Sequence, residues 1–219
     1  MKSRAVQRQK EAVPGALALY GGSFDPVHLG HEAVVYGLLR NLDMPVWVMP
    51  VGRQPQRQPC FESGAHRKEL LEAAFAHEQR VFVSSLELES SGPSFTIDTV
   101  AELQRRGAQT IWLCLGADAA MGLPTWHRAS ALARTVSVYI ICRTGWTVDR
   151  SVLYRLGFAE QQVAVLELDT PDISSSEVRS RLQTGKNLSG MLGPAVMAKI
   201  SRYGWYGTPA VIMSGHEET

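Results

Sequence analysis

Two histidines stand close together in the segment GGSFDPVHLGH, which spans residues 21–31. His28 and His31 are three residues apart, so their side chains would share one face at the start of a helix. The glycines before them let the backbone come close to a ligand. A helix N-terminus adds unpaired N–H groups and the positive end of the helix dipole. One histidine alone would be read as an ordinary core or surface residue, but the whole segment indicates a binding site for phosphate groups.

The segment DISSSEVRSRL at residues 172–182 places small hydroxyl side chains before another helix. Taken by itself, this run reads as a helix cap, because such side chains accept hydrogen bonds from free backbone N–H groups. Arg179 would project from the first turn of that helix, and its planar guanidinium group fits the oxygens of a phosphate. Beside the histidine segment, a phosphate-binding role for Arg179 is favoured.

Short apolar runs alternate with helical patterns along the chain, which predicts βαβ units and a mostly parallel sheet. The apolar runs are nearly continuous, as expected for strands buried on both faces. The predicted strands span residues 16–22, 45–51, 81–88, 110–118, 135–143 and 163–169. The predicted helices span residues 28–42, 64–77, 94–107, 174–184 and 193–203. We therefore predict an α/β fold with a doubly wound, Rossmann-like parallel sheet and a small C-terminal helical segment.

Ligands of such sheets bind beyond the carboxyl ends of the strands. This rule places the chemistry at residues 21–31, 50–57, 115–118 and 142–144. The stretch 52–63 is rich in Pro, Gln and Arg and is predicted to be a loop near the mouth of the site. We expect one domain at 15–207, with its C-terminal helices from about 172, between a flexible leader at 1–14 and a tail at 208–219.

The composition is that of an ordinary globular domain, with 45% hydrophobic and 20% charged residues and a net charge of +1. The near-equal numbers of basic and acidic residues do not favour a nucleic-acid or membrane partner. No apolar run is long enough to span a membrane. The N-terminus lacks the apolar core of a signal peptide. The three cysteines form no CxxC pair, which favours reduced thiols and a cytoplasmic protein. No metal-binding cluster stands out, and a homo-oligomer is left open.

Both segments resemble signatures of one enzyme superfamily. GGSFDPVHLGH resembles the GxFxPxHxGH signature of nucleotidyltransferases that carry an HxGH motif, and ISSSEVR at 173–179 resembles their second signature, ISSTxxR. Three further strings are similar to bacterial nicotinate mononucleotide adenylyltransferases: PSFTIDTV at 93–100, LGADAAMGLPTWHR at 115–128 and LGPAVMAKISRYGWY at 192–206. The resemblance covers nearly the whole chain, from about residue 16 to about residue 206.

The resemblance implies adenylyl transfer from ATP to nicotinate mononucleotide, giving nicotinic acid adenine dinucleotide and pyrophosphate in NAD biosynthesis, with Mg²⁺. It implies catalytic roles for His28, His31 and Arg179. The implied ATP-binding residues are Gly21, Gly22, Ser23, Phe24, His28, His31, Gly116, Asp118, Ser175, Ser176 and Arg179. The implied residues for the second substrate are Arg57, Thr96, Asp118, Trp126 and Arg143, although Trp126 could equally be a packing residue after a proline turn.

The chain departs from the family pattern mainly after the second predicted strand. Relatives carry an Asn and a PPH[KR] string there, whereas this chain reads PVGRQPQR at 50–57 and keeps only the basic Arg57 at its end. Arg143 stands alone where relatives often have two arginines, and Ser23 replaces a commoner Thr.

Several alternatives remain open at this stage. Nicotinamide mononucleotide or another phosphorylated small molecule could be the acceptor, as in phosphopantetheine adenylyltransferases and cytidylyltransferases, although those are not expected to share the PSFTIDT and PTWHR strings. A fragment of an aminoacyl-tRNA synthetase is disfavoured by the short chain and its balanced charge. A non-catalytic nucleotide-binding paralog is motivated by the divergent loop and opposed by the intact histidines and Arg179.

Overall fold

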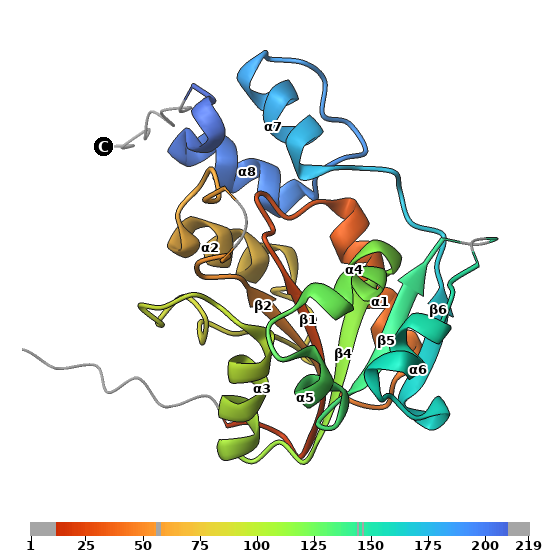
Figure 1. The fold of residues 1–219 in the computed structure, drawn as a ribbon. Helices are drawn as coiled ribbons and strands as arrows, with labels where there is room; N and C mark the ends of the chain where they lie inside the picture. Colours follow the sequence, from red (N-terminus) through yellow and green to blue (C-terminus); the bar gives the residue numbers. More distant parts are fainter. Residues whose placement is uncertain (1–11, 56–57, 144, 146, 210–219) are drawn as a thin grey trace, which may run out of the picture.

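The computed structural model describes residues 12–55, 58–143, 145 and 147–209 (Figure 1). The strands are β1 (Ala16–Gly22), β2 (Val46–Pro50), β3 (Val81–Val83), β4 (Thr110–Gly116), β5 (Ser137–Cys142) and β6 (Val163–Glu167). The helices are α1 (Leu29–Asn41), α2 (Gly64–Ala74), α3 (Thr96–Arg105), α4 (Ala117–Gly122), α5 (Ala129–Ala133), α6 (Ser151–Leu156), α7 (Ser175–Gln183) and α8 (Pro194–Tyr203). Three short 3₁₀ turns are η1 (Leu123–Thr125), η2 (Glu160–Gln162) and η3 (Trp205–Gly207). The predicted leader and tail fall mostly outside the described residues.

The six strands form one sheet in the order β3-β2-β1-β4-β5-β6, and every neighbouring pair is parallel. The chain builds outward from β1 to β2 and β3, then crosses back to β4 and builds in the other direction. The strand order therefore reverses between β1 and β4, and ligands of open α/β sheets bind at such a reversal. This confirms the predicted fold class and places the end of β1 at the centre of the ligand-binding edge.

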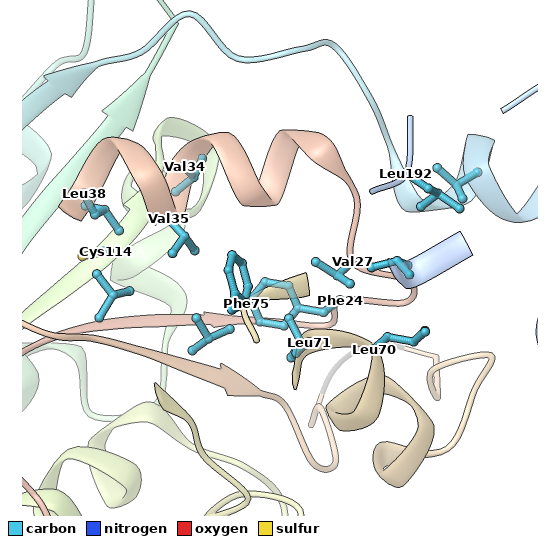
Figure 2. Packing of buried hydrophobic residues seen from close by; sticks show 14 of the residues in the cluster. Phe24, Val27, Val34, Val35, Leu38, Leu70, Leu71, Phe75, Cys114 and Leu192 are labelled. Carbon is cyan, nitrogen blue, oxygen red and sulfur yellow. The ribbon is translucent and has the colours of Figure 1, made fainter. Parts of the chain in front are cut away.

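Two hydrophobic cores cover the two faces of the sheet. One core packs residues of α1, α2, α7 and α8 against the sheet, among them Val35, Leu70 and Val196. Figure 2 shows part of this core, where side chains from α1 and α2 meet Phe24 and Val27 of the segment that follows β1. The other core packs α3, α4, α5 and α6 against the opposite face. The histidine segment is thus fixed by burial of its own apolar side chains as well as by the helix it starts.

Some predicted elements need correction. The third strand was expected to reach residue 88 but ends at Val83, where the ladder closes with the Ser84 N–H donating to the Val48 carbonyl (3.0 Å). The chain then bends, and the Glu87 carbonyl comes so close to Gly52 that a β-carbon there would lie 2.2 Å from it. The fourth strand ends at Gly116 and Asp118 lies on α4, a helix that the sequence did not predict. Helices α4, α5 and α6 have only five or six residues, which is too short to show a helical period.

Candidate active site

A polar cavity of about 530 Å³ opens beside the turn that follows β1, and we call it the Arg179 cavity. Most of the residues predicted to bind phosphate come together here from the segment after β1, from α1 and from α7. Its walls are Ser23, Phe24, Asp25, His31, Gln54, Gln58, Pro59, Cys60, Ser175, Ser176 and Arg179.

The two histidines form a stacked pair at the start of α1. Their ring centroids are 3.7 Å apart with planes 28° apart, and the edge of the Phe24 ring supports His31 at a centroid distance of 5.0 Å. His28 is the N-cap residue, and its carbonyl accepts from the backbone N–H groups of His31 (2.8 Å) and Glu32 (3.1 Å). Gly30 makes this packing possible, because a β-carbon there would lie 3.0 Å from Nδ1 of His28. The predicted shared face is therefore confirmed as a ring stack.

Burial keeps both imidazoles neutral. Loss of solvent lowers the pKa of His28 to about 4. Burial, and the repulsion that two protonated rings would exert on each other, hold the pKa of His31 well below its usual range. The backbone N–H of His28 donates to Nδ1 of His31 (3.3 Å), so the single ring proton of neutral His31 is on Nε2. His31, which lines the cavity, therefore acts there as a neutral N–H donor.

Arg179 ties the second segment to the first. Its guanidinium group donates to the Asp25 carbonyl (2.6 Å) and to Oγ of Ser176 (3.1 Å), and it lies 3.8 Å from the Asp25 carboxylate. Oγ of Ser175 donates to the Pro26 carbonyl (3.0 Å). About a quarter of the Arg179 side chain stays exposed to the cavity. A guanidinium group has five N–H donors, so Arg179 keeps donors for a ligand.

Asp25 is the structural centre of this cavity, and the sequence analysis did not single it out. Its carboxylate is only 4% exposed and accepts from the backbone N–H groups of Phe61 (2.6 Å) and Glu62 (3.1 Å) and from the Tyr206 hydroxyl (3.1 Å). Burial and the nearby Asp25 carboxylate raise the pKa of Tyr206, so this hydroxyl stays a donor. The partners lie far away in sequence, and the only signal for Asp25 was its place inside the quoted segment.

Arg67 fixes the two loops above β1 and β2. It is 2% exposed and donates to the carbonyls of Ser23 (2.6 Å) and Val51 (2.8 Å). A buried arginine that pairs with backbone carbonyls holds both loops at a set distance. Nothing in its position on α2 marked this role in the sequence.

A second cavity, of about 670 Å³, lies beside Gly21 and Gly22 at the end of β1, and we call it the Trp126 cavity. Thr96, the first residue of α3, and Trp126, which follows η1, both line it. Its other walls are Leu19, Met49, Val51, Gln54, Pro55, Glu87, Ser94, Phe95, Leu113, Leu115, Ala119, Thr125 and His127. The rings of Phe95 and His127 lie 4.3 Å apart at its edge. The cavity therefore combines aromatic and aliphatic walls with several polar side chains.

Glu87 is the acidic group of the Trp126 cavity that the sequence analysis missed. Its carboxylate accepts from Oγ1 of Thr99 (2.7 Å), and burial raises its pKa. The predicted extension of the third strand hid this residue, because it placed Glu87 within a regular strand.

Comparison with known proteins assigns the family. The family described as cytidylyltransferase-like matches residues 19–181. A protein of Bordetella petrii named as a probable nicotinate-nucleotide adenylyltransferase is 34% identical over 87% of this chain and 98% of its own length. The chain belongs to the nicotinate-nucleotide adenylyltransferase family. A Gemmatimonas aurantiaca protein of the same name is 33% identical over 87% of this chain and 92% of its own.

A solved structure agrees with the fold of this adenylyltransferase family member. The Plasmodium falciparum nicotinic acid mononucleotide adenylyltransferase complexed with NaAD superposes with a TM-score of 0.72, covering 89% of this chain and 98% of that one. The identity is 22%, so this likeness confirms the fold.

Some predicted site residues do not line either cavity. His28 is buried behind His31, and Gly116 and Asp118 lie at the end of β4 and on α4. Arg143 is exposed and pairs with Asp172 (2.5 Å), while Arg57 lies outside the described residues. The three described cysteines are free thiols. Within the described ranges, no helix is long and apolar enough to cross a membrane.

Proposed function

We propose that this protein transfers the AMP part of ATP to the phosphate of nicotinate mononucleotide, releasing pyrophosphate and forming nicotinic acid adenine dinucleotide. The observation that carries the proposal is the arrangement of two cavities around one turn. The stacked histidines and Arg179 stand on one side of Gly21–Phe24, and Thr96 and Trp126 stand on the other. A reaction that joins two nucleotides needs two such neighbouring sites.

In this proposal the Arg179 cavity holds the triphosphate. His28 and His31 act at the α-phosphate, where His31 offers a neutral Nε2–H. Ser175, Ser176 and Arg179 hold the β- and γ-phosphates at the N-terminus of α7, whose dipole favours anions. The backbone of the Gly22–Phe24 turn lies along the nucleotide. Gly116 and Asp118, at the reversal of strand order, would contact adenosine.

The chemistry needs no general base. The attacking group is a phosphate that already carries about −1.5 to −2 charges near neutral pH. One of its oxygens forms a bond to the α-phosphorus while the bond from that phosphorus to the oxygen of the β-phosphate breaks, and pyrophosphate leaves. Catalysis then depends on in-line positioning and on donors that stabilise charge on the α-phosphate and the leaving group. Imidazoles kept neutral by burial suit this donor role.

In the Trp126 cavity, the proposal places the nicotinate ring against Trp126. An indole face stacks well on a flat, positively charged pyridinium ring. Thr96 and Ile97 begin α3, so their backbone N–H groups have no partner within the helix and can bind a carboxylate. This feature favours nicotinate over nicotinamide. Arg57 and Arg143 stay predicted to bind the second substrate.

The Mg²⁺ ion is part of the proposal as a companion of ATP. Within the described residues, no group of three metal-ligating side chains is present, and the Asp25 carboxylate already accepts three hydrogen bonds. Mg²⁺ in nucleotide enzymes is commonly held by substrate phosphates with few protein ligands. The site therefore fits an ion that arrives on the triphosphate and helps neutralise its charge.

The test is direct. The protein is incubated with ATP, Mg²⁺ and either nicotinate or nicotinamide mononucleotide, and both pyrophosphate and the dinucleotide product are measured. We expect product with both substrates present and a preference for nicotinate. A preference for nicotinamide would contradict the assignment of the carboxylate to α3, and no pyrophosphate with any mononucleotide would favour a binding protein without catalytic activity.

A further inference from the structure

Gln54 stands where the two cavities meet. Among the described residues, it is the one side chain that lines both the Arg179 cavity and the Trp126 cavity. It lies in the loop after β2, the loop in which this chain departs from the family pattern. If the two substrates occupy the two cavities, their reacting phosphates must meet at this boundary.

The amide of Gln54 is held in place from the histidine segment. Its Nε2 donates to Oγ of Ser23 (3.2 Å), and the side chain is half-buried between the loops. Arg67 sets the distance between these loops, because it donates to the carbonyls of Ser23 and Val51 at the same time. A primary amide carries two N–H donors. The hydrogen bond to Ser23 uses one and fixes the direction of the other.

We propose that Gln54 is a catalytic residue. Its remaining amide N–H donates to phosphate oxygens at the point where the α-phosphate of ATP and the phosphate of the mononucleotide join. This inference rests on the proposed function. At the moment of transfer, two negatively charged groups come within bonding distance, so a donor at their contact point stabilises the transition state more than either bound substrate. Because the amide of Gln54 carries no net charge, it does not bind an anion tightly in the free enzyme. Gln54 thus supplies a polar contact in a loop that lacks the Asn and His of the family pattern.

The test compares four variants in steady-state kinetics with ATP and nicotinate mononucleotide. Gln54→Met keeps the length of the side chain and removes its donors, and Gln54→Glu places a negative charge at the meeting point. Gln58→Glu makes the same charge change in the Arg179 cavity only. Gln104→Glu makes it on the exposed face of α3.

We expect Gln54→Met to lower kcat about 10-fold to 100-fold with less than a threefold change in either KM, since removal of one transition-state donor costs about this much or more. Gln54→Glu should lower kcat further. Gln58→Glu should act mainly on the KM for ATP, and Gln104→Glu should match the parent enzyme. Unfolding midpoints of all four variants establish that they are folded, and if Gln54→Glu is not folded the Met variant decides.

The outcomes separate this inference from the function on which it rests. If the parent enzyme makes the dinucleotide and Gln54→Met retains its kcat within threefold, the role of Gln54 is overturned and the proposed function stands. If Gln54→Met changes only the KM values, Gln54 is a binding residue and the catalytic assignment is wrong. If the parent enzyme makes no dinucleotide from either mononucleotide, both proposals are overturned.

Discussion

The two cavities beside β1 are built by different forces. Hydrogen bonds between distant segments hold the Arg179 cavity together: Asp25 accepts from Tyr206, 181 residues away, and its carbonyl accepts from Arg179, 154 residues away. The Trp126 cavity is shaped by apolar packing and by the close approach of the Glu87 carbonyl to Gly52. The Arg179 cavity presents hydrogen-bond donors held in fixed positions, and the Trp126 cavity presents a surface against which a flat ring can pack.

This difference explains which parts of the site can change. When one residue of a buried hydrogen-bonded set moves, the groups that it paired with stay buried without partners, and the folded state is destabilised. A shaped apolar surface tolerates changes that conserve volume. The divergent loop after β2 lies at the boundary of the two cavities, whereas His28, His31 and Arg179 follow the family signatures.

The largest effect is expected at the histidine pair. His28→Ala and His31→Ala should each lower kcat about 10²-fold to 10³-fold, because His31 is the proposed donor at the α-phosphate and the stacked His28 ring holds it in place. Binding of a non-hydrolysable ATP analogue, measured by calorimetry, should weaken far less. His77→Ala, on an exposed histidine, is the matched control. Unchanged turnover in either variant would remove that residue from the mechanism.

The next effect concerns the stability of the Arg179 cavity. Asp25→Asn should lower the free energy of unfolding by about 3 kcal/mol, because a buried carboxylate that accepts three hydrogen bonds becomes a neutral amide with its own donors. Tyr206→Phe removes one of these hydrogen bonds and should cost about 1 kcal/mol. Urea unfolding measures both. Equal losses would mean that the Asp25 charge does not hold this cavity together.

Trp126 tests the other side of the comparison. Trp126→Ala should raise the KM for nicotinate mononucleotide about 10-fold, since stacking of a base on an aromatic side chain is worth about 1–3 kcal/mol. The KM for ATP should stay within twofold, because Trp126 lines only the second cavity. Trp112→Phe, which alters a tryptophan that packs edge-on against Tyr139, serves as control. A larger effect on ATP than on the mononucleotide would show that the two sites are assigned in reverse.

The smallest effect is a difference in pH dependence. The pKa of His28 in the folded protein, about 4, lies below its ordinary value of 6.5. The unfolded chain therefore binds more protons between these values, and stability falls as the pH drops from about 6.5 toward 4. Burial raises the pKa of Glu87, so the folded protein binds its proton more readily, and this contribution to stability is lost as pH rises.

The contributions of His28 and Glu87 to stability should therefore change with opposite signs in acid. In urea unfolding at pH 7 and pH 5, His28→Gln should show a smaller loss of stability than the parent protein. Glu87→Gln should show a larger loss. The same pH dependence in both variants and the parent would mean that neither group is held in its shifted state.

The sequence alone determined the order of the strands and the five longer helices, together with the residues that have obvious chemistry. Apolar runs between helical patterns fixed the class of fold, because strands buried on both faces must be apolar along their whole length. His28 and His31 were found because their spacing matches a helical turn, and Arg179 because it follows a helix cap. These features depend on residues that are close together in the sequence, so the sequence pattern alone can predict them.

Only the tertiary structure decided how those residues are supported. Burial makes the two stacked imidazoles neutral, and this burial comes from the folded chain. The Asp25 carboxylate joins the segment after β1 to the 61–62 loop and η3, and Gln54 lies between two cavities. Both features depend on contacts between segments far apart in the chain. The bend after Val83 was missed for the same reason, since it is set by where the β2 ladder ends and not by the residues that bend. Long-range burial and hydrogen bonding leave no periodic mark in a sequence, and in this protein they place the groups that complete the site.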